Sequence, residues 1–422
     1  MKHLLLIYLL IFCPIIQGPL AGSDKIQLRD ICPPGFQLDE QNRCLQRNMY
    51  QFYDSLQDSG VGGTKTALPL PRDGFSPQQI DLGRYLFFDP LLSGDNSLSC
   101  ANCHQPDKGF ADGLGRSVGI GGHRVERSAP SLWNVAFQKR LFWDARAGTL
   151  EQQMLGPLYA KEEMGNSPKQ LLQDLNNNEI YRELFTDAFS QMSVADSAND
   201  NESRISPVGI TLSQVYTALA AFQSSLISLN SRYDQYAHGY SDALNKKELE
   251  GLNVFRSFVA RCAECHTPPL FTNQQIAVIG APESEGLPFD IGAERTFDTA
   301  RLKGGFKVPS LRNVARTAPY MHSGKFKTLR ETVAFYSGGR GHAVPAELKL
   351  ELHWHIWEPN LSSDEMDRVV DFLHTLTDES FMPSVPAHLP SGLPSTFSSQ
   401  LDHPPSNAIN SRENNNPQGE KS

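Results

Sequence analysis

Two copies of the pattern C-x-x-C-H, at positions 100–104 and 262–266, have the types and spacing that most clearly indicate chemistry. In this pattern both thiols add covalently to the vinyl groups of one c-type haem, and the adjacent histidine binds its iron. A zinc site would need the two cysteine pairs to meet in one compact cluster, and a redox dithiol would not need a histidine after each pair. The sequence therefore predicts two covalent haems, held by Cys100, Cys103 and His104 and by Cys262, Cys265 and His266.

The first residues have the form of an export signal. Lys2 precedes an almost unbroken apolar run over positions 4–16, and small residues follow near Ala21. The run is too short for a stable membrane span, so we expect a cleavable signal peptide at positions 1–22 and no membrane span in the mature chain. Covalent haem attachment takes place outside the cytoplasm, which agrees with export. The predicted location is the periplasm.

The remaining cysteines indicate a small N-terminal extension. The chain has 7 cysteines, of which Cys13 lies in the signal and only Cys32 and Cys44 lie outside both haem motifs. In an oxidising compartment such a pair forms a structural disulfide. We expect the Cys32–Cys44 disulfide to stabilise an extension at positions 23–65 that has little core of its own.

Length and charge narrow the class of protein. A chain of 422 residues suggests about 2–3 domains, and 39% hydrophobic residues can supply an apolar sleeve for each haem. The net charge of −9 gives no support for nucleic-acid binding. A small redox protein or a protein substrate remains a plausible partner, and the overall charge does not choose between them.

Helical patterns surround both motifs and predict the fold class. Pro77 begins a helix that must stop at Asp89-Pro90, and Ser362 with Glu365 forms a capping box that opens a last helix running to Leu376. Further helices are expected at positions 150–154, 168–175, 180–189, 211–229 and 248–259.

No repeated strand pattern occurs. The predicted fold is mainly α, with two cytochrome c-like haem domains packed face to face at positions 66–238 and 239–380. Positions 381–422 are rich in proline, serine and asparagine and are expected to form a disordered tail.

Two further blocks of sequence resemble bacterial di-haem cytochrome c peroxidases and MauG-like enzymes. The first is F-W-D-A-R-A at 142–147, with the Gln-Gln, Gly-Pro and Glu-Glu-Met groups that follow it up to position 164. The second is V-P-S-L-R-N-V at 308–314, followed by T-A-P-Y-M-H-S-G at 317–324. The resemblance covers roughly positions 76–377, and it implies two cytochrome c-type domains, usually with a calcium ion between them.

The resemblance gives roles to three residues of the first block. Glu163 would move a proton between the two oxygens of bound peroxide, so that the O–O bond breaks heterolytically. Gln153 would hydrogen-bond a ligand or water in the distal pocket, and Trp143 would pass electrons or holes between the haems. By themselves these residues read more simply as a solvated glutamate, a helix-surface amide and a core tryptophan. The surrounding block favours the catalytic roles.

Tyr336 separates the two branches of this family. It stands fourteen residues after His322, where peroxidases have a methionine that completes the second haem and MauG-like proteins have a tyrosine. A thioether favours ferrous iron, whereas a phenolate is a hard anionic donor that favours ferric and higher states. A core tyrosine on the face of Leu329 and Val333 is the simpler alternative. The matching offset favours Tyr336 as the sixth ligand of the second haem.

The chain also departs from the family pattern. Ser128 stands where an asparagine commonly helps to hold calcium, although Thr317 and Pro319 match carbonyl donors to that ion. Ala260 stands where MauG has a surface tryptophan that passes holes to its partner, so the exit route is not predicted. His123 lies where peroxidases carry a switchable sixth ligand, but its offset is shorter, so we expect the first haem to have His104 alone and an open distal side.

One further pair of histidines has the spacing of a candidate metal site. His353 and His355 flank Trp354, but no further ligand lies nearby in the sequence. A surface or packed segment is therefore favoured over a metal site.

Three functions remain, and the residues rank them. The first is a MauG-like enzyme that uses hydrogen peroxide to form a high-valent di-haem state and oxidises residues, such as tryptophan, on a partner protein. The second is a cytochrome c peroxidase that reduces peroxide with electrons from a small cytochrome c or cupredoxin, and the third is a di-haem electron carrier. Gln153 and Glu163 argue against the carrier, and Tyr336 argues against the standard peroxidase. We expect the first function.

Overall fold

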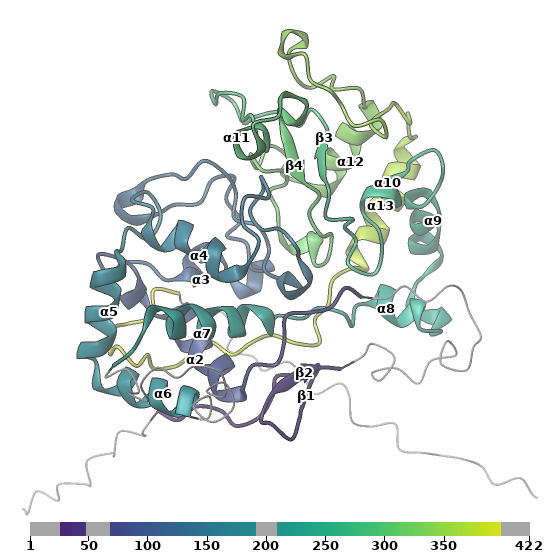
Figure 1. The fold of residues 1–422 in the computed structure, drawn as a ribbon. Helices are drawn as coiled ribbons and strands as arrows, with labels where there is room; N and C mark the ends of the chain where they lie inside the picture. The colour runs from purple at the N-terminus through teal and green to yellow at the C-terminus, as the bar shows by residue number, and fades with distance from the viewer. Residues whose placement is uncertain (1–25, 48–67, 191–208, 398–422) are drawn as a thin grey trace, which may run out of the picture.

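The fold of this chain comes from a computed structural model that describes residues 26–47, 68–190 and 209–397 (Figure 1). Helices dominate, and the described strands form only two small antiparallel pairs, which confirms the mainly α prediction. No helix within the described residues combines the length and the apolar character needed to cross a membrane. The signal peptide expected at positions 1–22 lies outside these residues.

The first half of the chain is built on a crossed pair of helices, α2 (Pro77–Phe88) and α7 (Leu212–Ser224). Pro77 takes the first turn of α2, as the sequence predicted, and Ser76 before it forms a capping box with Gln79. The two helices approach closely at Gly83, where an added Cβ atom would lie 1.9 Å from the carbonyl oxygen of Ala218. Only glycine allows this contact.

The second half repeats the same crossing with α9 (Lys246–Phe255) and α13 (Ser363–His374). Here a Cβ atom added to Gly251 would lie 1.9 Å from the carbonyl oxygen of Arg368. The glycine also faces an aromatic residue in both halves, Phe222 in the first and Phe372 in the second. The two halves are therefore more alike than the motifs alone indicated.

Short helices and strands fill the space between these pairs. The helices are α3 (Cys100–Cys103), α4 (Leu150–Tyr159), α5 (Pro168–Asn177), α6 (Glu179–Phe189), α8 (Arg232–Ala237), α10 (Cys262–Cys265), α11 (Glu294–Phe297) and α12 (Leu329–Gly338), and the strands are β1 (Phe36–Leu38), β2 (Cys44–Gln46), β3 (Ile276–Val278) and β4 (Gly305–Lys307). Short 3-10 turns join several of them.

Three helices end earlier than predicted, namely α7, α9 and α13, the last at His374 instead of Leu376. Helix α7 stops at Ser224, although the prediction ran to position 229. The apolar residues beyond it, Leu226, Ile227 and Leu229, are buried all the same, but in non-helical chain. Helix α9 stops at Phe255 rather than at position 259. Burial without helical backbone explains the error over residues 225–229.

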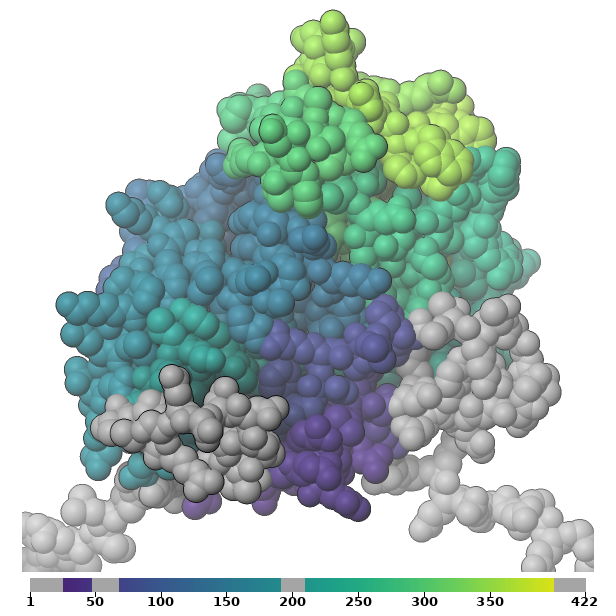
Figure 2. Space-filling view, in the orientation of Figure 1, coloured from purple at the N-terminus to yellow at the C-terminus, as the bar shows by residue number. Residues whose placement is uncertain are grey.

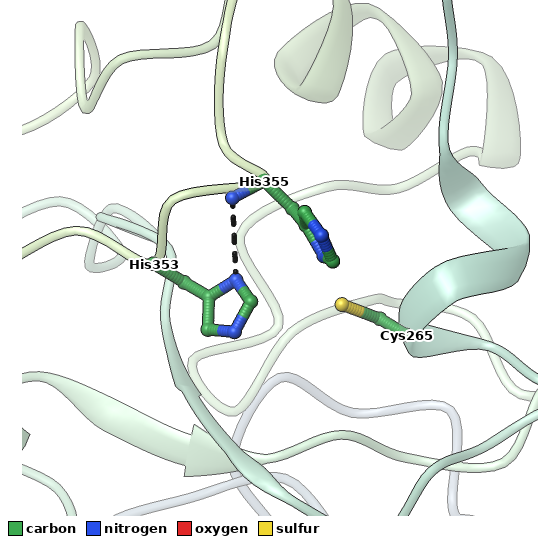
Figure 3. Close-up of side chains that lie close together, drawn as sticks. All are labelled: Cys265, His353 and His355. Atoms are coloured by element: carbon green, nitrogen blue, oxygen red, sulfur yellow. Dashed lines mark hydrogen bonds between the residues drawn. The ribbon is translucent and has the colours of Figure 1, made fainter. Parts of the chain in front are cut away.

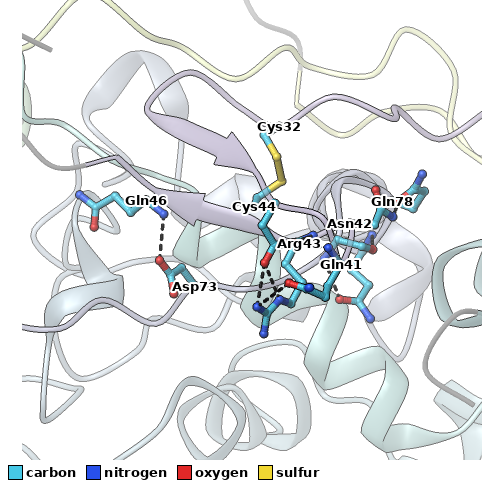
Figure 4. Close-up of a disulfide and its surroundings, with 11 residues drawn as sticks. Cys32, Gln41, Asn42, Arg43, Cys44, Gln46, Asp73 and Gln78 are labelled. Atoms are coloured by element: carbon cyan, nitrogen blue, oxygen red, sulfur yellow. Dashed lines mark hydrogen bonds and ion pairs between the residues drawn. A yellow bond between two sulfur atoms is a disulfide. The ribbon is translucent and has the colours of Figure 1, made fainter. Parts of the chain in front are cut away.

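The N-terminal extension is joined by a disulfide and packs beside the start of α2 (Figure 4). Cys32 and Cys44 form this disulfide, and the β1–β2 hairpin lies between and after them. The backbone N–H of Cys44 donates to the carbonyl of Phe75 at 2.8 Å, and that of Gln46 donates to Asp73 at 2.8 Å. These bonds attach the hairpin to the chain that leads into α2.

The segment after α13 corrects one prediction. Residues 381–397 were expected to belong to a disordered tail, but they pack across the first half of the molecule. Leu389 and Phe397 are buried in its core, and the rings of Phe397 and Phe88 lie 6.1 Å apart. Well-spaced apolar residues anchor this segment in spite of its polar, proline-rich composition. Residues 398–422 lie outside the described part of the chain.

The two halves touch over a broad face (Figure 2). Arg127 of the first half forms an ion pair with Asp290 of the second, with 2.6 Å between the guanidinium nitrogen and the carboxylate oxygen. A Cβ atom added to Gly324 would lie 2.1 Å from Cα of Gly115, so the backbones of the two halves are in direct contact. The site lies along this junction.

Candidate active site

Both C-x-x-C-H motifs open into one cavity of about 1160 Å³. Its walls come from both halves and are mostly apolar around the motifs, with Phe87, Leu132, Leu150 and Met154 on the side of the first motif. The site residues singled out in the sequence also line it: Trp143, Gln153, Glu163, Thr317, Pro319 and Tyr336. The fold thus brings the two motifs and the two sequence blocks to one place.

The first motif holds its histidine in a defined orientation. Cys100 and Cys103 lie on the single turn of α3, and His104 follows as its C-cap. Nδ1 of His104 lies 2.9 Å from the carbonyl oxygen of Phe110. This bond makes Nδ1 the protonated nitrogen and leaves the lone pair of Nε2 free to bind a metal ion. Burial lowers the pKa of His104, which also favours the neutral, ligating form.

The second motif repeats this arrangement. Cys262 and Cys265 lie on α10, and Nδ1 of His266 lies 3.1 Å from the carbonyl oxygen of Phe271. Burial lowers the pKa of His266 to about 4. In both motifs two cysteines and one oriented, neutral histidine face an apolar cavity. These residues fit two covalently attached c-type haems.

Glu163 lies in the wall of the cavity near the first motif. Burial raises the pKa of its carboxyl group above the ordinary value of 4.5, against the opposing charge of Arg146. The carbonyl oxygen of Glu163 accepts a hydrogen bond from Ile120 at 2.9 Å, and a Cβ atom added to Gly119 would lie 1.8 Å from the carbonyl oxygen of Glu162. The glycine-rich loop therefore fixes the turn that carries Glu163. Its carboxylate makes no hydrogen bond to the described residues and is free to act on a ligand.

Gln153 and Pro157 face the same side of the cavity from α4. The Gln153 amide has no hydrogen-bond partner among the described residues, so it too is available to a ligand. Pro157 lacks any group that could bind a metal. His123, which stands where peroxidases carry a switchable sixth ligand but was not expected to act as one here, is exposed and does not line the cavity. The cavity wall near the first motif is thus lined by the carboxyl group of Glu163, the amide of Gln153 and the ring of Pro157.

Helices α4 and α12 hold equivalent positions in the two halves. Each has 10 residues, each begins after a threonine cap, and each follows an isolated β-bridge, Leu141–Ala147 or Tyr320–Phe326. The eighth residue is Pro157 in α4 and Tyr336 in α12. Pro157 was not singled out in the sequence. The shared Thr-Leu at the two helix starts is the signal that could have identified it.

Tyr336 points its ring into the cavity rather than into the core. Its helical neighbours Leu329 and Val333 belong to the buried apolar cluster of the second half, and Tyr336 does not. Its hydroxyl has no hydrogen-bond partner among the described residues. Burial raises the pKa of this phenol. A phenol placed here ionises only if a cation compensates the charge.

Trp143 lies at the junction of the two halves. Its indole N–H donates to the carbonyl of Ser128 at 3.0 Å, and its ring centroid lies 6.5 Å from that of His322. Its own carbonyl accepts from the backbone N–H of Lys307 at 2.7 Å. The indole is therefore held between a residue of the first half and one of the second.

Lys307 is a polar residue at this junction that sequence reasoning missed. Its ammonium group donates to the side chain of Gln138 at 2.5 Å, and burial lowers its pKa to about 8. It follows an ordinary strand residue and precedes V-P-S-L-R-N-V, so nothing in its local sequence marks it. Only the packing of the two halves buries it in the wall of the cavity.

The residues expected to bind calcium differ in whether their oxygen atoms are already engaged in hydrogen bonds. Thr317 and Pro319 both line the cavity, and neither carbonyl accepts a hydrogen bond from the described residues. The hydroxyl of Ser128, in contrast, donates to the carbonyl of Met321 at 3.0 Å. Two carbonyl oxygens are thus available to a hard cation such as Ca²⁺, whereas Ser128 is engaged elsewhere.

Comparison with protein families and curated proteins agrees with this geometry. The family model described as di-haem cytochrome c peroxidase matches residues 77–242. The chain is 32% identical over 321 residues to the methylamine utilization protein MauG of Methylorubrum extorquens, covering 76% of this chain and 84% of that protein. It is 30% identical over 306 residues to the cytochrome c551 peroxidase of Pseudomonas aeruginosa, covering 72% of this chain and 79% of that protein.

Solved structures show the same relationship. The fold is similar to that of a MauG-like protein associated with microbial copper homeostasis, with a TM-score of 0.65, 30% identity, and coverage of 76% of this chain and 96% of the other. It is also similar to the diheme peroxidase BthA of Burkholderia thailandensis, with a TM-score of 0.62, 26% identity, and coverage of 78% and 99%.

Proposed function

Because the chain belongs to the family of di-haem cytochrome c peroxidases and MauG, haem oxidoreductases that act with hydrogen peroxide, we propose that it is a MauG-like enzyme that oxidises residues of a partner protein. Tryptophan is the proposed target, since it is among the most easily oxidised side chains. The partner would meet the enzyme in the periplasm, after export by the signal at positions 1–22.

The position of Tyr336 carries this proposal. Its unpartnered hydroxyl faces the cavity beside Cys262 and Cys265, at the helix position that Pro157 holds in the first half. A phenolate ligand at the second haem would favour oxidised iron, whereas electron uptake from a small carrier needs a haem that is easily reduced. A tyrosinate ligand would therefore favour a haem that stays oxidised over one that is quickly reduced by a small electron carrier.

The groups near the first motif would handle peroxide. The two bound haems supply the redox chemistry itself. Glu163, whose raised pKa brings it closer to neutral pH, takes a proton from one peroxide oxygen and delivers it to the other. The Gln153 amide orients the peroxide by hydrogen bonding. Pro157 leaves room for it, and Trp143 provides a π-system at the junction through which electrons can pass.

Spectra of the ferric protein test this assignment. We expect a low-spin signal from a haem with histidine and tyrosinate ligands, and its loss in Tyr336→Phe. Tyr320→Phe is a matched control, because Tyr320 also lines the cavity but its hydroxyl donates to the carbonyl of Val314 at 3.1 Å. A ferric spectrum that is unchanged in Tyr336→Phe would exclude the ligand and, with it, the MauG-like reaction.

A cytochrome c peroxidase is the second candidate. The relative from Pseudomonas aeruginosa named as a peroxidase is 30% identical to this chain, close to the 32% of MauG. This function predicts steady consumption of peroxide with reduced cytochrome c or cupredoxin. Turnover faster than the oxidation of any partner protein would favour it over the first candidate.

We also propose a calcium ion at the junction, held by the carbonyls of Thr317 and Pro319. Neither oxygen accepts a hydrogen bond from residues 26–47, 68–190 or 209–397, which supports the assignment. The engaged hydroxyl of Ser128 removes one ligand from the set that the family uses, so the ion would be bound weakly. Calorimetric titration of the chelator-treated holoenzyme with Ca²⁺ tests this, and no heat of binding would refute it.

A further inference from the structure

The segment between α12 and α13 folds back over the second haem motif. The backbone N–H of His353 donates to the carbonyl of Val278 in β3 at 2.8 Å. The indole N–H of Trp357 donates to the carbonyl of Val259, just ahead of the motif, at 3.1 Å. These two bonds hold the intervening residues, including His355, against α10.

This fold brings two histidines to the edge of the second motif (Figure 3). One ring nitrogen of His353, one of His355 and the sulfur of Cys265 all lie within 4.8 Å of one another. Because Cys265 attaches haem, its sulfur would be a thioether in the mature protein, and we do not count it as a ligand. A carboxylate from the same turn takes its place: Oε2 of Glu264 lies 2.5 Å from Nε2 of His355.

The ring of His355 has one charged neighbour among the described residues, the carboxylate of Glu264, whose Oε2 pairs with its Nε2. Nδ1 of His355 is buried and has no hydrogen-bond partner among the described residues. A buried imidazole nitrogen without a partner is costly. In His353, Nδ1 accepts the backbone N–H of His355 at 3.3 Å, so the neutral ring carries its proton on Nε2. A metal ion would bind Nε2 of His353 once the proton moves to Nδ1 and this long bond is given up.

We propose that His353, His355 and Glu264 bind a divalent transition-metal ion, Zn²⁺ or Cu²⁺, at the edge of the second haem motif. Such ions bind well to imidazole and carboxylate ligands. Mg²⁺ and Ca²⁺ bind mainly oxygen ligands, so a site with two imidazoles does not suit them. Metal–ligand bonds of about 2.0–2.2 Å place two ligand atoms of a tetrahedral site about 3.3 Å apart. The histidine nitrogens lie within 4.8 Å of each other, so their separation needs to shorten by at most about 1.5 Å. Water would complete the coordination.

An ion at this place has a structural and an electrostatic consequence. It would join residues 353–355 to residue 264, and so fasten the returning segment to α10. It would also put positive charge next to the haem-attaching sulfur of Cys265. The site goes beyond the proposed function, because it does not depend on which peroxide reaction the enzyme performs.

Zinc binding to the haem-loaded, full-length protein tests the site. After chelator treatment we expect isothermal titration with Zn²⁺ to give one ion per chain, and metal analysis after dialysis to give the same ratio. His353→Gln and His355→Gln should each weaken binding about 10–100-fold or more, the range found when partners of metal ligands are removed. His388→Gln is the matched control, since His388 is an exposed histidine far from this cluster in the sequence. It should bind zinc as the unchanged protein does.

Two results would overturn the proposal: no zinc binding by the unchanged holoenzyme, or equal affinity in the His353→Gln/His355→Gln double variant. Glu264 lies inside a haem motif, so Glu264→Gln is informative only where haem absorbance shows full loading. His353→Gln lies outside the motif and keeps the test decisive in any case. The proposed function fails by a different measurement, the ferric spectrum of Tyr336→Phe, so the two failures are distinguishable.

Discussion

The two halves of the molecule use one scaffold for two different metal environments. Each has a crossed helix pair with a glycine contact, at Gly83 and Gly251, and each orients its proximal histidine by a bond to a backbone carbonyl. The halves differ at the eighth residue of helices α4 and α12, which is Pro157 in the first half and Tyr336 in the second. The comparison teaches that one scaffold orients the histidine of each motif in the same way, and that the residues facing the cavity from α4 and α12 are what distinguish the two halves.

The largest expected effect comes from the acid in the first half. Glu163→Gln keeps the size of the side chain and removes its ability to move a proton. We expect the rate of reaction with peroxide to fall by about 10²–10⁴-fold, the usual contribution of a general acid–base group. Rapid-mixing absorbance measurements would record this rate. Glu162→Gln is the control, because that neighbouring carboxylate is exposed and should change the rate little.

The pH dependence should follow the same carboxyl group. Burial raises the pKa of Glu163 above 4.5, and only the ionised form can accept the peroxide proton. The reaction rate should therefore increase with pH through a midpoint above 4.5 and level off beyond it. The effect of pH on stability has the opposite sign. A raised pKa means that the folded state favours the neutral carboxylic acid, so the free energy of unfolding falls as the pH rises past the pKa of this group in the unfolded chain. A pH–rate profile that is the same in Glu163→Gln would contradict the role.

Exchange of the eighth residue tests the comparison directly. Pro157→Tyr gives the first half the phenol that the second half has at the same helix position. We expect a second low-spin ferric signal and the loss of most peroxide reactivity, because the open side becomes occupied. Pro157→Ala leaves the side open and serves as the control. Full reactivity in Pro157→Tyr would show that the two helix positions are not equivalent.

The smallest effects concern the scaffold. Gly83→Ala and Gly251→Ala each place a methyl group 1.9 Å from a carbonyl oxygen, so both should lower the free energy of unfolding by similar amounts, about 1–3 kcal/mol. Gly148→Ala is the control, because its added atom meets only the flexible end of Gln152 at 3.5 Å. Chemical denaturation would measure all three. Very different losses at Gly83 and Gly251 would mean that the halves are less alike in packing than in backbone.

Local chemistry determined much of this protein from sequence alone. The C-x-x-C-H motifs, Pro77 at the start of α2 and the pair Cys32 and Cys44 each act over a few neighbouring residues, so they can be identified without a structure. The role proposed for Tyr336 came from the family resemblance, through its fixed offset from His322, and it stays a prediction. By contrast, composition failed for residues 381–397, because a few apolar anchors are enough to hold a polar segment once a partner surface exists.

Contacts between distant residues were decided only by the tertiary structure. The raised pKa of Glu163 comes from burial, and its turn is packed against a glycine-rich loop that lies about forty positions earlier in the chain. No acidic residue stands directly beside His353 or His355 in the sequence, and the fold places the carboxylate of Glu264, from the other end of the second half, next to His355. Burial and proximity are properties of the packed chain, and no local pattern contains them.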